Sequence, residues 1–208
     1  MLFFSTIEET IGVILGLIVA ITVHEASHAL VADRLGDPTP RLQGRLTLNP
    51  LAHLDPIGTL LLVVARFGWG KPVQFDPFNL KDPQKDSALI SLAGPAANIA
   101  TASLIALVFR LTEPLAQYNT SFITVFLLVA VLNINLAVFN LIPIPPLDGS
   151  KFLAGVLPRV FAPLAYSLEQ YGFFVLIGLL FFFPAFLPSI MLPITHAISR
   201  LLFGGIFL

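Results

Sequence analysis

The chain has 208 residues, of which 56% are hydrophobic and only 11% charged, against about 25% charged in an ordinary soluble domain. This composition indicates an integral membrane protein surrounded by a lipid bilayer, and the net charge of −1 argues against nucleic-acid binding. The chain has no cysteine, which excludes disulfides, iron–sulfur clusters and thiolate zinc sites. Any bound metal must therefore depend on His, Asp or Glu.

Apolar runs predict an all-α membrane protein, a multi-spanning helical bundle of about five to six hydrophobic segments, because a spanning helix needs about 20 apolar residues. The first predicted helix runs from about Glu8 to Leu35, and the sequence Gly36-Asp37-Pro38 should end it. Further spans are predicted, in chain order, at residues 87–109, 120–141, 161–183 and about 190–208.

A polar, proline-rich region separates the first two spans and predicts a small β/loop insertion near residues 44–76. Residues 44–48 alternate between polar and apolar side chains, as in a short strand, and a small hairpin is expected near residues 73–75. Between these, residues 56–65 are apolar but too few to span, which favours a re-entrant or interfacial segment.

The first predicted helix carries an H-E-x-x-H motif, His24-Glu25-Ala26-Ser27-His28, at the end of its apolar run. Two histidines four residues apart share one helix face, so both imidazoles can reach one metal ion. The glutamate beside the first histidine can then activate a water at that metal. Ionisable groups at membrane depth are costly, so we interpret His24 and His28 as metal ligands and Glu25 as a general base. The alternative is a polar helix end at the membrane interface.

Lysine and arginine predict the orientation of the helices. Residues 34–85 hold seven of the eleven basic residues and should face the cytoplasm, whereas residues 110–120 hold one and should face the other side. The third span then returns to the cytoplasmic side and brings Asp148 to the depth of the two histidines. Because two histidines and a carboxylate make up one kind of catalytic zinc site, Asp148 is predicted as the third ligand. Its alternative role is to cap the next helix.

Three motifs together resemble the site-2 protease family of intramembrane zinc metalloproteases: HEASH, SLAGPAAN at residues 91–98, and NLIPIPPLDG at residues 140–149. The segment RLTLNPLAHLDPIGTLL, which begins at Arg45, and the short spacing between motifs are similar to the compact, PDZ-less prokaryotic branch. The resemblance covers about residues 10–155, and it implies one zinc ion per chain. The prolines before Asp148 also predict an extended chain there.

Other polar residues have both a functional and a structural interpretation. Asn140 is predicted as a catalytic residue that hydrogen-bonds the developing oxyanion, unless it satisfies carbonyls of its own helix. Asn98 is placed either for a similar role or for a hydrogen bond across helices. His53, in a polar loop beside Asp55, and His196, in the tail, are more typical of structural histidines.

We expect residues 1–208 to form a single transmembrane metalloprotease domain, with a catalytic core at about 8–155 and C-terminal helices at about 160–208. The resemblance implies cleavage of single-span transmembrane proteins, in regulated intramembrane proteolysis, by an enzyme of the prokaryotic plasma membrane. Two alternatives stay open: a metal-ion transporter with the same ligands, and a catalytically silent membrane chaperone or sensor with the same fold. The sequence does not indicate the oligomeric state.

Overall fold

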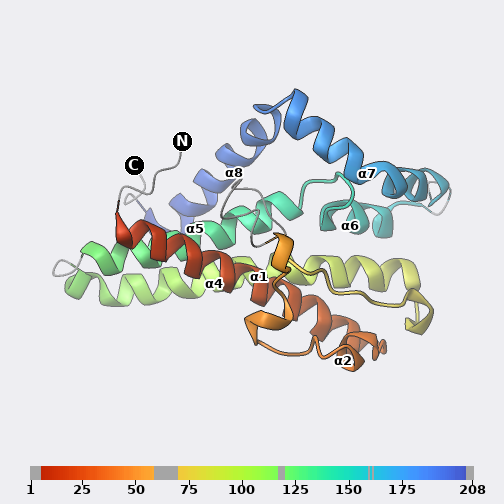
Figure 1. Cartoon of the computed structure of the whole chain (residues 1–208), viewed down its shortest axis with the longest axis horizontal. Helices are drawn as coiled ribbons and strands as arrows, with labels where there is room; N and C mark the ends of the chain where they lie inside the picture. The colour runs from red at the N-terminus through yellow and green to blue at the C-terminus, as the bar shows by residue number, and fades with distance from the viewer. Residues whose placement is uncertain (1–5, 59–69, 117–119, 159, 161, 205–208) are drawn as a thin grey trace.

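The computed structural model describes residues 6–58, 70–116, 120–158, 160 and 162–204. Three long helices pack against one another at the centre of the bundle (Figure 1). The last two helices form a V in this view, and α8 packs against α5 and α4. The all-α prediction is confirmed. The helices are α1 (Ile7–Leu35), α2 (Thr39–Leu42), α4 (Pro83–Ala116), α5 (Thr120–Asn140), α6 (Asp148–Val156), α7 (Ala162–Phe182) and α8 (Phe186–Phe203).

The long helices have the length and composition of membrane spans. Within the described residues, four of them qualify, and together they make this a multi-pass membrane protein. In α7, the apolar stretch Gln170–Phe182 is shorter than a span, so the predicted span at 161–183 stays a prediction. The spans are Ile7–Leu35, Pro83–Thr112, Ser121–Asn140 and Phe186–Phe203, in agreement with the predicted positions.

The boundaries of α1 follow local rules. Thr6 caps its start, since its Oγ1 accepts a hydrogen bond from the Glu9 amide at 3.2 Å. Gly36 ends it with a φ of 114°, a left-handed conformation that favours glycine. The predicted stop signal therefore acts where expected.

Two glycines on one face of α1 let α5 approach closely. A Cβ at Gly12 would lie 2.7 Å from Leu128 Cδ1, and one at Gly16 would lie 2.6 Å from Leu132 Cδ1. Small residues at such spacing are typical of tightly packed membrane helices, where close backbone approach replaces the hydrophobic effect. This contact fixes α1, and with it the HEASH motif, against the neighbouring span.

The connection between α1 and α4 contains no strand in its described parts, so the predicted strand at 44–48 and the hairpin near 73–75 are wrong. An isolated antiparallel bridge joins Leu54 to Gly70. Side chains form hydrogen bonds with backbone groups that would pair with a neighbouring strand in a sheet. The buried Arg45 guanidinium donates to the carbonyls of Ala52 and Lys71. The predicted re-entrant segment lies largely outside the described residues.

A buried carboxylate organises the two ends of this connection. Asp37 accepts hydrogen bonds from Thr39 Oγ1 at 2.6 Å, from the Asp76 amide at 2.8 Å and from Asn79 Nδ2 at 2.8 Å. Burial alone would raise the pKa of Asp37, but these hydrogen bonds outweigh it and lower the pKa below its usual value. The residues just before Asp76, which reach the functional site, are thereby held next to the end of α1.

Candidate metal centre

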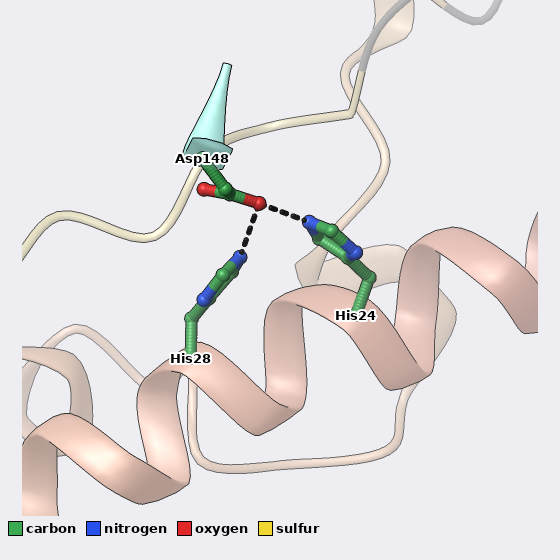
Figure 2. Close-up of side chains that lie close together, drawn as sticks. All are labelled: His24, His28 and Asp148. Carbon is green, nitrogen blue, oxygen red and sulfur yellow. Dashed lines mark hydrogen bonds and ion pairs between the residues drawn. The ribbon is translucent and has the colours of Figure 1, made fainter. Parts of the chain in front are cut away.

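Three predicted site residues meet although Asp148 lies 124 positions after His24 in the sequence (Figure 2). Asp148 Oδ2 is 3.0 Å from His24 Nε2 and 3.2 Å from His28 Nε2. One ligand atom from each residue lies within 4.8 Å of the other two. The histidines share one face of α1, as their spacing predicted, and Asp148 is the first residue of α6.

The second nitrogen of each imidazole is held by an oxygen. His24 Nδ1 lies 2.7 Å from Asn98 Oδ1, and His28 Nδ1 lies 2.7 Å from the carbonyl oxygen of Ile90. The orientation of the Asn98 amide is fixed in turn, because its Nδ2 donates to the Ala20 carbonyl at 2.9 Å and to Asn133 Oδ1 at 2.9 Å. Each Nδ1 therefore donates its proton to an oxygen, and in a neutral imidazole this leaves the Nε2 lone pair directed toward Asp148.

These partners create a site that requires a positive charge. Two lone pairs and a carboxylate oxygen in contact repel one another unless a cation or added protons lie between them. Imidazole and carboxylate ligands, with the outer imidazole nitrogens hydrogen-bonded, are typical of zinc sites.

Two glycines make room for the three ligands. A Cβ at Gly94 on α4 would lie 2.5 Å from His28 Nε2 and 2.7 Å from His24 Nε2. A Cβ at Gly149 would overlap the carbonyl of Leu141 at the end of α5. A side chain at either position would push α4 or α6 away from the histidines.

The connection from α5 to Asp148 is a series of turns, so the predicted extended chain is wrong. Ile144 N–H donates to the Ile142 carbonyl at 2.8 Å, and Leu147 N–H donates to the Ile144 carbonyl at 3.0 Å. The Pro145–Pro146 peptide bond is cis. The prolines do end α5, but the compact turns, rather than an extended segment, bring Asp148 back to α1.

A pocket of about 130 Å³ opens beside the three ligands. Glu25 lines it, and its Oε2 accepts a hydrogen bond from the Val73 amide at 2.8 Å. The remaining lining residues come from the α1–α4 connection, from α4, and from the region of α5 and α6. They are Pro72, Val73, Phe75, Ile90, Ser91, Asn140, Pro146 and Lys151.

Known proteins resemble this chain in sequence. Residues 110–183 match the family model described as Peptidase family M50. A Bacillus subtilis protein named "Putative zinc metalloprotease YwhC" is 40% identical over 171 residues, which cover 80% of this chain and 78% of that protein. A Mycolicibacterium smegmatis protein named "Putative zinc metalloprotease Rip2" is 35% identical over 184 residues, which cover 85% of this chain and 69% of that protein.

The chain belongs to peptidase family M50. The resemblance to the site-2 protease family is thus confirmed. No solved structure matches the chain.

The other polar residues for which the sequence suggested a role differ in their positions in this M50 protein. Asn140 lines the pocket, but its Nδ2 donates to the Leu136 carbonyl of its own helix at 3.0 Å. Asn98 bonds across helices, to His24, and so supports a ligand instead of facing the pocket. His53 is fully buried, and its Nε2 donates to the Thr47 carbonyl at 2.8 Å. His196 lies exposed on α8.

The hydrogen bond across helices that was one predicted role of Asn98 is present, but the sequence identified neither His24 as its partner nor the space that Gly94 provides. Both residues belong to SLAGPAAN. Gly94 and Asn98 are four residues apart and so share a helix face. Gly94 and Asn98 lie four and eight residues after Ile90, whose carbonyl holds His28. This regular spacing on one helix face was the signal that the sequence offered.

Proposed function

We propose that this protein is a zinc metalloprotease that hydrolyses peptide bonds in the transmembrane segments of membrane-anchored proteins. One observation carries the proposal: two imidazole nitrogens on a helix of membrane-spanning length converge with the Asp148 carboxylate beside the Glu25 carboxylate. Two similar proteins have names that begin "Putative zinc metalloprotease", which agrees with this assignment.

The ligands we assign to zinc are His24 Nε2, His28 Nε2 and a carboxylate oxygen of Asp148. Three protein ligands leave a position open, which is the arrangement of catalytic zinc sites. A bound zinc ion supplies Lewis acidity, which polarises a substrate carbonyl and makes a nearby water more acidic.

Glu25 is the proton carrier in this mechanism. Its carboxylate lines the same pocket as the ligands, so it can accept a proton from the attacking water and deliver it to the leaving amine. The hydrogen bond from the Val73 amide fixes one carboxylate oxygen and leaves the other for this work. Asn140 is a candidate for the oxyanion, since an amide that bonds one helix carbonyl retains a second N–H.

The depth of the site fits a substrate within the membrane. The 29 residues of α1 extend about 44 Å, longer than a hydrocarbon core of about 30 Å, and His24 lies about 26 Å from the start of the helix. The ligands are therefore inside the bilayer but near one surface. The basic residues assign that surface to the cytoplasm, through which water reaches the pocket.

We assign the whole chain to one protease domain of the cell membrane, with a single-span membrane protein as substrate. A metal-ion transporter has no use for a base such as Glu25 beside the ligands. A silent chaperone or sensor has no need to retain all three ligands and the base.

The deciding experiment measures proteolysis by the purified protein. A tagged single-span substrate is incubated with detergent-solubilised or reconstituted enzyme, with and without 1,10-phenanthroline, and zinc is quantified by mass spectrometry. Cleavage within the span that stops with chelator and returns with zinc supports the proposal. A zinc-loaded protein that cuts none of a panel of such substrates, but transports zinc into vesicles, would overturn it.

A further inference from the structure

Ser91 lines the pocket and has a buried hydroxyl without a hydrogen-bond partner among the described residues. Its side chain is 1% exposed. A buried hydroxyl left unpaired is costly, and such groups in native structures usually have a partner. The missing partner of Ser91 is therefore expected in whatever occupies the pocket that it lines.

Other hydroxyls on the same helix behave differently. Thr101 Oγ1 donates to the Ala97 carbonyl at 2.8 Å, Ser103 Oγ to the Ile99 carbonyl at 2.8 Å, and Thr112 Oγ1 to the Val108 carbonyl at 2.9 Å. This bond to the carbonyl four residues earlier is the usual way for a helix hydroxyl to be satisfied in an apolar environment. Ser91 does not use it, although it is more deeply buried than Ser103.

The position of Ser91 on α4 places it close to the ligands in sequence and along the helix. Gly94, three residues later, lies directly under both Nε2 atoms, and residues three apart are neighbours on a helix surface. The carbonyl of the preceding residue, Ile90, holds His28. Ser91 thus lies one helical turn from Gly94, toward the N-terminal end of α4.

Two of the other donors in the pocket are wholly or partly engaged. The Val73 amide bonds to Glu25, and one N–H of Asn140 Nδ2 bonds to Leu136, which leaves its second N–H. A peptide in the pocket brings carbonyl oxygens, which need donors when they leave water or a helix.

We propose that Ser91 Oγ donates a hydrogen bond to a substrate carbonyl oxygen in the pocket and is a further catalytic residue. The identity of the occupant as a peptide rests on the proposed function. Negative charge develops on the carbonyl oxygen during hydrolysis, so this bond is stronger in the transition state than in the bound substrate.

The test compares Ser91→Ala with Ser103→Ala. The second change removes a hydroxyl of the same helix that already donates to a carbonyl of that helix. Ser91→Ala should lower kcat by about 10- to 100-fold, as expected for a hydrogen bond to a charged group, with a smaller change in KM. Its zinc content should match the wild type, and its melting temperature should stay equal or rise, because an unpaired buried hydroxyl has been removed. Ser103→Ala should leave kcat within about 2-fold of the wild type.

A second readout does not depend on turnover. Acetohydroxamic acid offers a carbonyl oxygen to the pocket of the zinc-loaded protein, and Ser91→Ala should weaken its binding by about 3- to 10-fold. Equal affinity and kcat in the two variants overturn the inference, as does a loss accompanied by a lower melting temperature or zinc content. A wild type that binds the hydroxamate but cuts no substrate contradicts only the proposed function, and the affinity ratio still decides the role of Ser91. A wild type that does not bind the hydroxamate overturns the role of Ser91.

Discussion

Asn98 on α4 accepts a hydrogen bond from His24 on α1, with 2.7 Å between Oδ1 and Nδ1, and this contact aims the opposite nitrogen of the imidazole at Asp148. The same amide is held by Ala20 and Asn133, so three helices determine the orientation of one side chain. The metal centre is consequently built by helix packing as much as by its own motif.

Substitution of Asn98 should therefore act on metal affinity. Asn98→Ala removes the acceptor for His24 Nδ1, and we expect zinc affinity to fall by about 10- to 100-fold, the usual effect of losing a partner of a ligand. Asn98→Asp restores an acceptor but removes both amide donors, so it should recover zinc affinity while lowering the melting temperature. Competition with a fluorescent chelator measures the affinity, with Thr101→Ala as control. Wild-type affinity in Asn98→Ala would contradict this role.

Glu25→Gln should separate metal binding from hydrolysis. The change keeps the size of the side chain and both histidines, so zinc content should remain at the wild-type level. The amide cannot accept a proton from water, and cleavage should fall to background, a loss of at least about 100-fold. The assay pairs zinc quantification with cleavage of a tagged substrate, and His24→Ala should lose both signals. Substantial cleavage by Glu25→Gln would disprove the proton-transfer mechanism.

Gly94→Ala tests whether close approach of α4 to the ligands is essential. The added Cβ would fall within 2.7 Å of Nε2 of both histidines, so zinc binding and cleavage should both be lost. Gly178→Ala in α7 is the matched control, because its Cβ would meet no atom within 4 Å. The control should be neutral or slightly stabilising, since alanine is about 1 kcal/mol better than glycine inside a helix. Equal zinc content in the two variants would show that α4 can move away.

The features that could be predicted from the sequence depend on residues close together in the chain or on the number of spans. The features that could not be predicted depend on how the helices are rotated against one another. Gly36 ends α1 by its own conformation, and Asp148 could be placed because three spans return the chain to one side. Asn98 could not be assigned, because its partner depends on how α4 is rotated against α1. The predicted strands failed for a similar reason. Arg45 bonds to the Lys71 carbonyl 26 residues later, and Glu25 bonds to the Val73 amide 48 residues later.

Topology reporters test the assigned orientation. A phosphatase or fluorescent fusion after Lys81 should report the cytoplasm, and an insertion near Gln117 should report the opposite side, because basic residues are retained in the cytoplasm. The same two fusions in a variant whose basic residues between 34 and 85 are replaced should report a weaker preference for this orientation. The reverse result in the wild type would open the metal centre to the other side of the membrane.

The last prediction concerns what makes a substrate helix cleavable. In a spanning helix each carbonyl is bonded to the amide four residues later, so Glu25 and the ligands cannot reach it. The substrate must unwind locally, and each polar group freed in lipid costs several kcal/mol unless it finds a partner. The pocket offers such partners only at the depth of His24. Residues that weaken the substrate helix near its cytoplasmic end should therefore raise turnover.

Gly lowers helix stability by about 1 kcal/mol and Pro by about 3 kcal/mol relative to Ala, so replacing such residues by leucine should slow cleavage without abolishing binding. If unwinding is limiting, 1 kcal/mol corresponds to about 5-fold in turnover. A substrate series graded in helix propensity, with binding and turnover measured on each member, gives this slope directly. The same series with its substitutions moved to the opposite end of the span is the control, because those residues do not reach the pocket. Turnover that is independent of propensity at constant binding would show that another step, such as product release, limits the reaction.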